Sequence, residues 1–110
     1  MQDGAPPHYA VAVRNFLNKN FPDRVISRGC KVEWPPRSPD LNPLDYWFWG
    51  ALKAKIFKKS TPSSVEHLKA LIQEECATFT DEDFSCAVSH LRQRLDLLVK
   101  VGGGHFEQFL

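Results

Sequence analysis

The sequence has no long apolar run, and this absence excludes a membrane-spanning helix. Such a helix needs about 20 consecutive apolar residues, and no stretch of the 110 residues approaches that length. The chain also lacks a basic segment followed by an apolar one at its start, so we expect no secretory signal. Repeats and low-complexity tracts are absent, and a composition of 43% hydrophobic and 25% charged residues is typical of one globular domain. We therefore expect an intracellular protein, in the cytosol or the nucleus.

Cysteine is scarce and has no framework spacing. The three cysteines, Cys30, Cys76 and Cys86, are an odd number without a C-x-x-C pair, which predicts free thiols. Cys86 and His90 lie four residues apart on a predicted helix, but two further ligands at suitable spacing are missing, so we expect no zinc site.

The net charge of +1 conceals an asymmetry along the chain. Residues 1–59 hold ten Lys or Arg and five Asp or Glu, a net charge of +5, whereas residues 60–110 hold four and eight, a net charge of −4. A basic half suggests a polyanionic partner for that half alone. Two ordinary solvated surfaces would give the same counts, and charge by itself leaves both interpretations open.

Four helices are predicted from apolar spacing and capping residues. Proline opens two of them, at Pro6 and at Pro43, because proline suits the first helical turn. The first should end near Phe21, before Pro22. Ser63 with Glu66 has capping-box spacing for a third, and Thr80 with the acidic turn after it starts a fourth, which Gly102, Gly103 and Gly104 end.

Two short β-branched segments, 24–27 and 31–34, separate the first two helices. The first is bounded by Pro22 and Gly29, which predicts extended chain, and the second is a further candidate strand. Because an isolated strand pair is marginal, we expect the edge of a sheet whose other strands lie elsewhere. The chain is thus predicted to be mostly α-helical with a short extended edge segment.

The segment WPPRSPDLNPLDYWFWG, residues 34–50, delivers one carboxylate to a helix start. Its prolines stiffen the chain up to Asn42-Pro43, and Asp45 follows in the first helical turn. A carboxylate that binds a metal ion needs such rigid placement, to about 0.5 Å. The alternative role for Asp45 is that of a cap beside the helix dipole, and spacing does not decide between the two. Asp40 lies in the turn itself and is interpreted as structural.

A second carboxylate, Asp3, precedes a glycine and another proline-led helix. Its position close to the start of the chain makes it prone to fraying, unless the sequence continues upstream as a strand. His8, in the first helical turn, is interpreted as a local hydrogen-bonding group rather than a member of a site.

Three segments together resemble the C-terminal part of the catalytic domain of mariner-superfamily transposases: QDGAPPH at 2–8, the segment at 34–50, and GGHFEQFL at 103–110. The resemblance implies an α/β ribonuclease H-like fold, here truncated, with an acidic triad for two divalent metal ions. Asp3 matches the second acid and Asp45 the third, so both become candidate catalytic and metal-binding residues for Mg²⁺ or Mn²⁺. The first acid is absent from this chain.

The resemblance also implies different roles for the two halves of the chain. Residues 1–59 would form the C-terminal half of the catalytic core, and residues 60–110 a helical extension of the same domain. DNA is the implied partner and the nucleus the implied location; no membrane or small-molecule cofactor is expected. The candidate DNA-binding residues are Arg37, Lys53, Lys55, Lys58 and Lys59.

Two functions follow as alternatives. The chain is part of a cut-and-paste transposase and inactive alone, or it is a non-catalytic helical DNA- or protein-binding module derived from a transposable element. Without a sheet, apolar helix faces at Trp47, Phe48 and Leu52 should remain partly uncovered and promote self-association.

Overall fold

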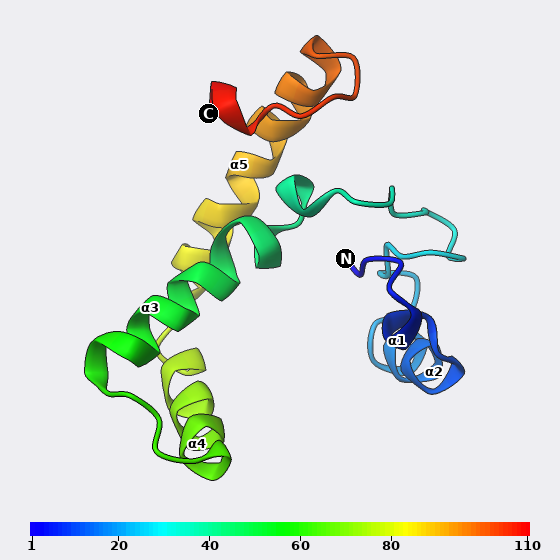
Figure 1. Cartoon of the computed structure of the whole chain (residues 1–110). Coiled ribbons are helices and arrows are strands. Elements are labelled where there is room, and N and C mark those ends of the chain that lie inside the picture. Colours follow the sequence, from blue (N-terminus) through cyan, green and yellow to red (C-terminus); the bar gives the residue numbers. More distant parts are fainter. The chain divides into compact units, whose positions relative to one another are not determined.

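The computed structural model describes residues 1–110, which form two compact units, Met1–Ser38 and Pro39–Leu110 (Figure 1). Each unit is described by itself. The predominance of helix is confirmed: five α-helices are present and no strand is formed.

The first unit contains α1 (Pro6–Tyr9) and α2 (Val11–Asn20). One continuous helix was expected, but Ala10 has an extended backbone, with φ −57° and ψ 145°, and divides it. Alanine favours helix, so this break is not set by the residue itself. The predicted end is confirmed: the N–H of Phe21 donates to the carbonyl of Leu17, and Pro22 follows.

The extended segment of the first unit makes only isolated backbone pairings and no strand ladder. Ile26 and Val32 form an isolated parallel bridge, and the N–H of Gln2 donates to the carbonyl of Ile26 at 2.9 Å. The two predicted strands therefore do not form, since a strand is stable only beside paired neighbours. Ser27 is the one buried residue of this unit, which consequently has no apolar core.

The second unit begins with a 3₁₀ turn, η1 (Pro39–Leu41), and then enters a long helix at Pro43, as predicted. The helix opens with a π-helical turn, η2 (Leu44–Phe48), and continues as α3 (Trp49–Lys59). The N–H of Trp49 donates to the carbonyl of Leu44, five residues back, which defines the wide turn.

Two further helices follow, α4 (Val65–Cys76) and α5 (Asp81–Lys100), and the 3₁₀ turn η3 (Glu107–Phe109) closes the chain. The cap of α4 was predicted one residue too early: Ser64, not Ser63, accepts the N–H of His67, at 3.0 Å. Because residues 63 and 64 are both serine, residue type did not indicate which of the two caps the helix.

The predicted ends of α5 are confirmed. Thr80 and Asp83 form a reciprocal capping box. At the other end, the N–H of Gly103 donates to Leu98 and that of Gly102 to Val99. This pairing is a Schellman motif, and it needs the positive φ of +67° at Gly102, which glycine adopts without strain.

The apolar core of the second unit lies between α3 and α4. Phe48, Leu52, Ile56 and Leu71 are buried, with Trp47, Leu68, Cys76 and Phe79 packed against them. The rings of Phe79 and Phe84 both meet Trp47 edge-on, with centroids 5.5 Å away. The expectation that Phe48 and Leu52 are uncovered is therefore wrong: α4 and these aromatic rings cover them without any sheet.

None of the helices has the length and apolar content that crossing a membrane requires.

Candidate functional site

Asp3 lies just before α1 and is held by local contacts. Its Oδ1 accepts the N–H of Ala5 at 3.3 Å and is hydrogen-bonded to Nδ1 of His8. The bond with His8 is the main cause that lowers the pKa of Asp3, and the Ala5 N–H adds to it, against the opposing effect of burial. His8 thus has the local role predicted for it. Because both bonds use Oδ1, Oδ2 of Asp3 makes none.

Asp45 lies in the π-helical first turn of the second unit and is exposed. The side chain of Asn42 accepts the N–H of Leu44 at 3.2 Å, so Asn42 supplies the cap. The Asp45 carboxylate makes no hydrogen bond or ion pair, and its structural role is limited to its position at the positive end of the helix.

A clamp from α5 holds the segment on which Asp45 lies. The guanidinium of Arg94 stacks on the ring of Tyr46, with 3.8 Å from Cζ to the ring centroid, and Nη1 donates to the carbonyl of Asp40 at 2.8 Å. The hydroxyl of Tyr46 donates to the carbonyl of Ala87 at 2.5 Å. Residues on α5 therefore fix both sides of the Asp40–Tyr46 segment. This contact uses the backbone carbonyl of Asp40, and the structural role expected for its side chain stays a prediction.

Sequence reasoning missed this clamp. Tyr46 lies in the segment 34–50, but Arg94 is 48 positions further along the chain and stands in no motif. The pKa of Tyr46 is raised because burial disfavours its charged form, an effect that the neighbouring Arg94 partly opposes.

The two candidate metal ligands belong to different units, Asp3 to the first and Asp45 to the second. Their pairing in space stays a prediction. No group of three or more His, Cys, Asp or Glu side chains is positioned to hold a metal ion. One carboxylate by itself does not make a magnesium site, because Mg²⁺ is usually held by one or two carboxylates together with substrate phosphates.

The four lysines of α3 fall into two classes. Lys55 donates to Oγ1 of Thr78 at 2.7 Å and lies 4.1 Å from the ring centroid of Phe79. Lys59 forms ion pairs with Glu74 at 2.9 Å and with Glu75, whose side chain is 4% exposed. Lys59 ties α3 to α4, and Lys55 ties α3 to the turn that follows α4.

Lys53 and Lys58 are exposed and have no ion-pair partner. Arg37 of the first unit is exposed as well, and its φ of +56° is rare for a residue other than glycine. Of the five predicted DNA-binding residues, Lys59 alone is in an ion pair and Lys55 is held by Thr78 and Phe79, whereas Lys53, Lys58 and Arg37 have neither kind of contact.

The first unit contains a cationic stack that the sequence did not suggest. The guanidinium carbons of Arg14 and Arg28 each lie 4.6 Å from the ring centroid of Tyr9. Neither arginine is in an ion pair. Gly29 allows this approach, because a Cβ at that position would lie 3.0 Å from the Tyr9 ring. A periodicity analysis could not have found the stack, since it depends on where Ala10 breaks the helix.

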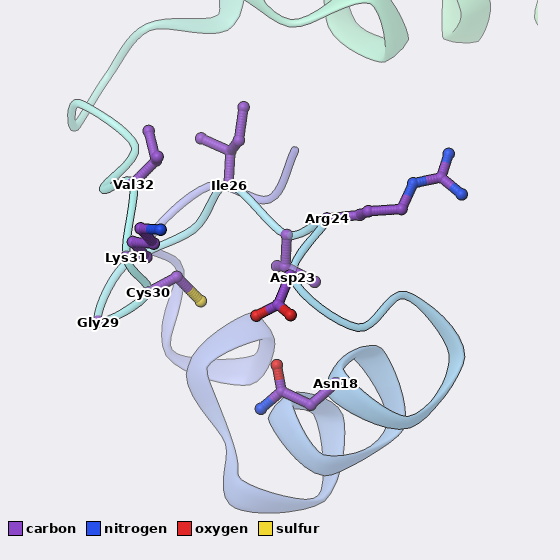
Figure 2. Close-up of a pocket in the computed structure, with 9 residues that line it drawn as sticks. Asn18, Asp23, Arg24, Ile26, Gly29, Cys30, Lys31 and Val32 are labelled. Carbon is purple, nitrogen blue, oxygen red and sulfur yellow. The ribbon is translucent and has the colours of Figure 1, made fainter.

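A pocket of about 460 Å³ opens between α2 and the extended segment (Figure 2). The side chains of Asn18, Asp23 and Cys30 point toward one another there, whereas Arg24 points away. None of the predicted site residues lines this pocket.

Comparison with known proteins gives one informative similarity. The transposable element Tc3 transposase of Caenorhabditis elegans is 26% identical to this chain over 103 residues, 93% of the chain. The chain spans 29% of that relative's length. No protein-family model and no solved structure matches the chain. The chain is therefore related in sequence to a transposase over nearly its whole length.

Proposed function

We propose that this chain is part of the catalytic domain of a cut-and-paste DNA transposase of the mariner superfamily. The observation on which the proposal rests is the similarity to a transposase across 93% of the chain. At 103 of 110 residues, the similar region includes the segment 34–50, which places Asp45 at a helix start.

The chain order in the first unit supports a truncated ribonuclease H-like fold. The hydrogen bond from Gln2 to Ile26 joins the segment before α1 to the segment after α2. Extended chain, helix and extended chain in this order is the arrangement of a crossover between parallel strands. A crossover helix normally packs its apolar face on the sheet. Without the sheet this unit has nothing to pack against, which accounts for its missing apolar core.

Asp3 and Asp45 are the proposed catalytic and metal-binding residues, as the second and third acids of a triad. Bound Mg²⁺ or Mn²⁺ would stabilise charge on the attacking and leaving oxygens of phosphodiester cleavage. Carboxylate oxygens are the ligands that Mg²⁺ prefers. Two features of the residues suit this role: the lowered pKa keeps Asp3 ionised, and the Asp45 carboxylate has no other partner.

DNA is the proposed partner in the nucleus, bound through its backbone. Lys53, Lys58 and Arg37 are the residues available for phosphate contacts, because their charges are unpaired. Lys55 and Lys59 also belong to the proposed cluster, but their contacts to Thr78, Phe79, Glu74 and Glu75 give them a structural role as well. Residues 1–59 are proposed as catalytic core and residues 60–110 as the helical extension, with the Arg94 clamp as the link that positions Asp45. No small-molecule cofactor is proposed.

One observation favours the alternative of a non-catalytic helical DNA- or protein-binding module. The second unit has its own apolar core and capped helices, so this part of the chain has what a domain needs to fold without catalytic partners.

The proposal is tested by a supercoiled-plasmid nicking assay on the 110-residue protein with Mg²⁺ or Mn²⁺. We expect no nicking, because two carboxylates cannot fix a metal pair without the third acid and substrate phosphates. Metal-dependent nicking that Asp45→Asn abolishes would show that the isolated chain is an enzyme, and would overturn its assignment as an inactive part.

The transcript upstream of Met1 separates the two candidates. An open reading frame that continues upstream into strand-forming sequence with a further Asp supports the transposase part. A stop codon in frame directly upstream supports the module.

A further inference from the structure

The cationic stack on Tyr9 carries two positive charges that the first unit does not neutralise. The guanidinium carbons of Arg14 and Arg28 each lie 4.6 Å from the same ring centroid, so they can be no further apart than twice that distance. Residues 1–38 hold six Lys or Arg and three Asp or Glu, and neither arginine of the stack is in an ion pair. Because like charges at this separation repel each other, the stack attracts an anion.

The stack also contains a hydrogen-bond donor that lacks an acceptor. Nε of Arg14 is buried and has no hydrogen-bond partner within the chain, whereas Arg28 is exposed. A buried donor without a partner costs free energy and is rare in folded proteins. A ligand that brings acceptor oxygens to the two guanidinium groups would account for it.

The local chain places the stack beside the segment that contains Asp3. A Cβ at Gly4 would lie 3.6 Å from Cδ of Arg28, so the side chain of Arg28 runs past the residue that follows Asp3. Tyr9 ends α1, the helix that Gly4 precedes. Gly29, with a φ of +73°, leaves room for the Tyr9 ring next to Arg28. An anion on the stack would therefore lie near the chain segment that carries the proposed acid.

Phosphate is the anion whose shape and charge suit this arrangement. A planar guanidinium donates two parallel hydrogen bonds to phosphate oxygens, and stacking on an aromatic ring fixes its plane before the ligand binds. A nucleic acid strand carries one negative charge for about every 3.4 Å of its axis. Two guanidinium groups separated by less than twice 4.6 Å can therefore contact phosphates of one strand.

We propose that Arg14 and Arg28, held on Tyr9, form a binding site for the phosphate groups of a DNA strand that passes Asp3. The identity of the ligand as DNA rests on the proposed function, whereas the affinity for phosphate requires neither a metal ion nor an acidic triad. The site belongs to the first unit and is separate from the lysines of α3. Because it contacts only the backbone, it should not discriminate between base sequences.

Substitutions that keep the charge test the site. In fluorescence anisotropy with a short DNA duplex and EDTA, Arg14→Lys and Arg28→Lys should each raise the dissociation constant about fivefold, because lysine lacks the planar fork. The salt dependence should change little, since the number of cations is the same. Arg24→Lys is the matched control, because Arg24 is an exposed arginine of the same unit outside the stack. If all three variants bind DNA as the wild type does, the proposal is wrong.

NMR of the unaltered protein covers the case in which a variant only unfolds the first unit. On titration with inorganic pyrophosphate, and separately with the duplex, the Nε–H signal of Arg14 should shift by more than that of Arg24. Sodium acetate at equal ionic strength should move neither signal, and Arg14→Lys assigns the Arg14 signal by removing it. Equal shifts of the two arginines, or equal shifts with acetate, would overturn the phosphate site. Shifts with pyrophosphate but not with the duplex would overturn DNA as its ligand.

Binding should also stabilise the first unit. A ligand that binds only the folded form stabilises it by mass action, so pyrophosphate at 100 times its dissociation constant should slow hydrogen exchange of the α2 amides about 100-fold. Amides of α3 should exchange at unchanged rates. Unchanged exchange in α2 at saturating pyrophosphate would contradict the site. None of these measurements depends on nicking, so the plasmid assay and this proposal can fail separately.

Discussion

At the scale of single residues, the position of Asp45 depends on two close neighbours in the sequence and on one side chain far away in it. Asn42 caps the helix start, and Arg94 and Tyr46 hold the segment against α5. The placement of Asp45 therefore involves Arg94, which belongs to neither predicted acidic motif.

Arg94→Ala should lower the free energy of unfolding by about 2 kcal/mol, because it removes a stacked cation and a charged hydrogen bond together. Tyr46→Phe, which removes only the bond to Ala87, should cost about 1 kcal/mol. Chemical denaturation followed by circular dichroism measures both. Gln93→Ala, at an exposed position of α5 without contacts, is the control and should change stability by less than about 0.5 kcal/mol.

The losses of stability caused by the two substitutions should not be additive, since both substitutions break the same clamp.

Tyr46→Phe should also change how stability depends on pH. Burial raises the pKa of Tyr46, so its contribution to stability is complete below the usual tyrosine pKa of about 10 and is lost as pH rises through the raised value. The variant should lose less stability than the wild type over that alkaline range. Full additivity, or an unchanged alkaline loss, would contradict the clamp.

At the scale of elements, the sequence predicts those features that depend on adjacent residues. Pro43, the Thr80–Asp83 box and the glycines after Val101 each act within one turn, and the structure confirms all three helix boundaries. The Ile26–Val32 bridge and the stack on Tyr9 depend on contacts between segments, which no local pattern encodes. For the candidate site, the sequence likewise predicted the helix start at Asp45 but not the clamp that holds it.

The α3 lysines yield a prediction at this scale, because their structural and free members can be separated. Lys53→Ala with Lys58→Ala should reduce the slope of log affinity against log salt by about 1 per lysine, with little effect on stability. Lys55→Ala with Lys59→Ala should instead destabilise the contact between α3 and α4. Fluorescence anisotropy with duplex DNA over a salt series, beside thermal denaturation, measures both effects.

Each lysine pair serves as the control for the other. If the Lys53 and Lys58 variant binds DNA with an unaltered slope, these lysines only solvate the end of the helix.

At the scale of the whole molecule, the two units differ in what stabilises them. The second unit buries an apolar cluster around Phe48, Leu52 and Ile56, whereas the first unit of 38 residues buries only Ser27. A domain below about 40 residues seldom folds without disulfides, metal ions or partner chains. The three cysteines are free, so no covalent bond compensates for the missing core of the first unit.

Native-state hydrogen exchange of the 110-residue protein should therefore show amides of α2 exchanging at nearly unprotected rates while those of α3 and α4 are protected. Leu52→Ala should cost about 2–5 kcal/mol and accelerate exchange in α3 and α4 alone, because Leu52 is 5% exposed in that core. Val11→Ala, at a position 63% exposed in α2, should change neither unit. Protection of α2 equal to that of α3 would mean that the first unit is stable without a sheet, which would remove the physical argument that residues 1–38 are the edge of a larger domain.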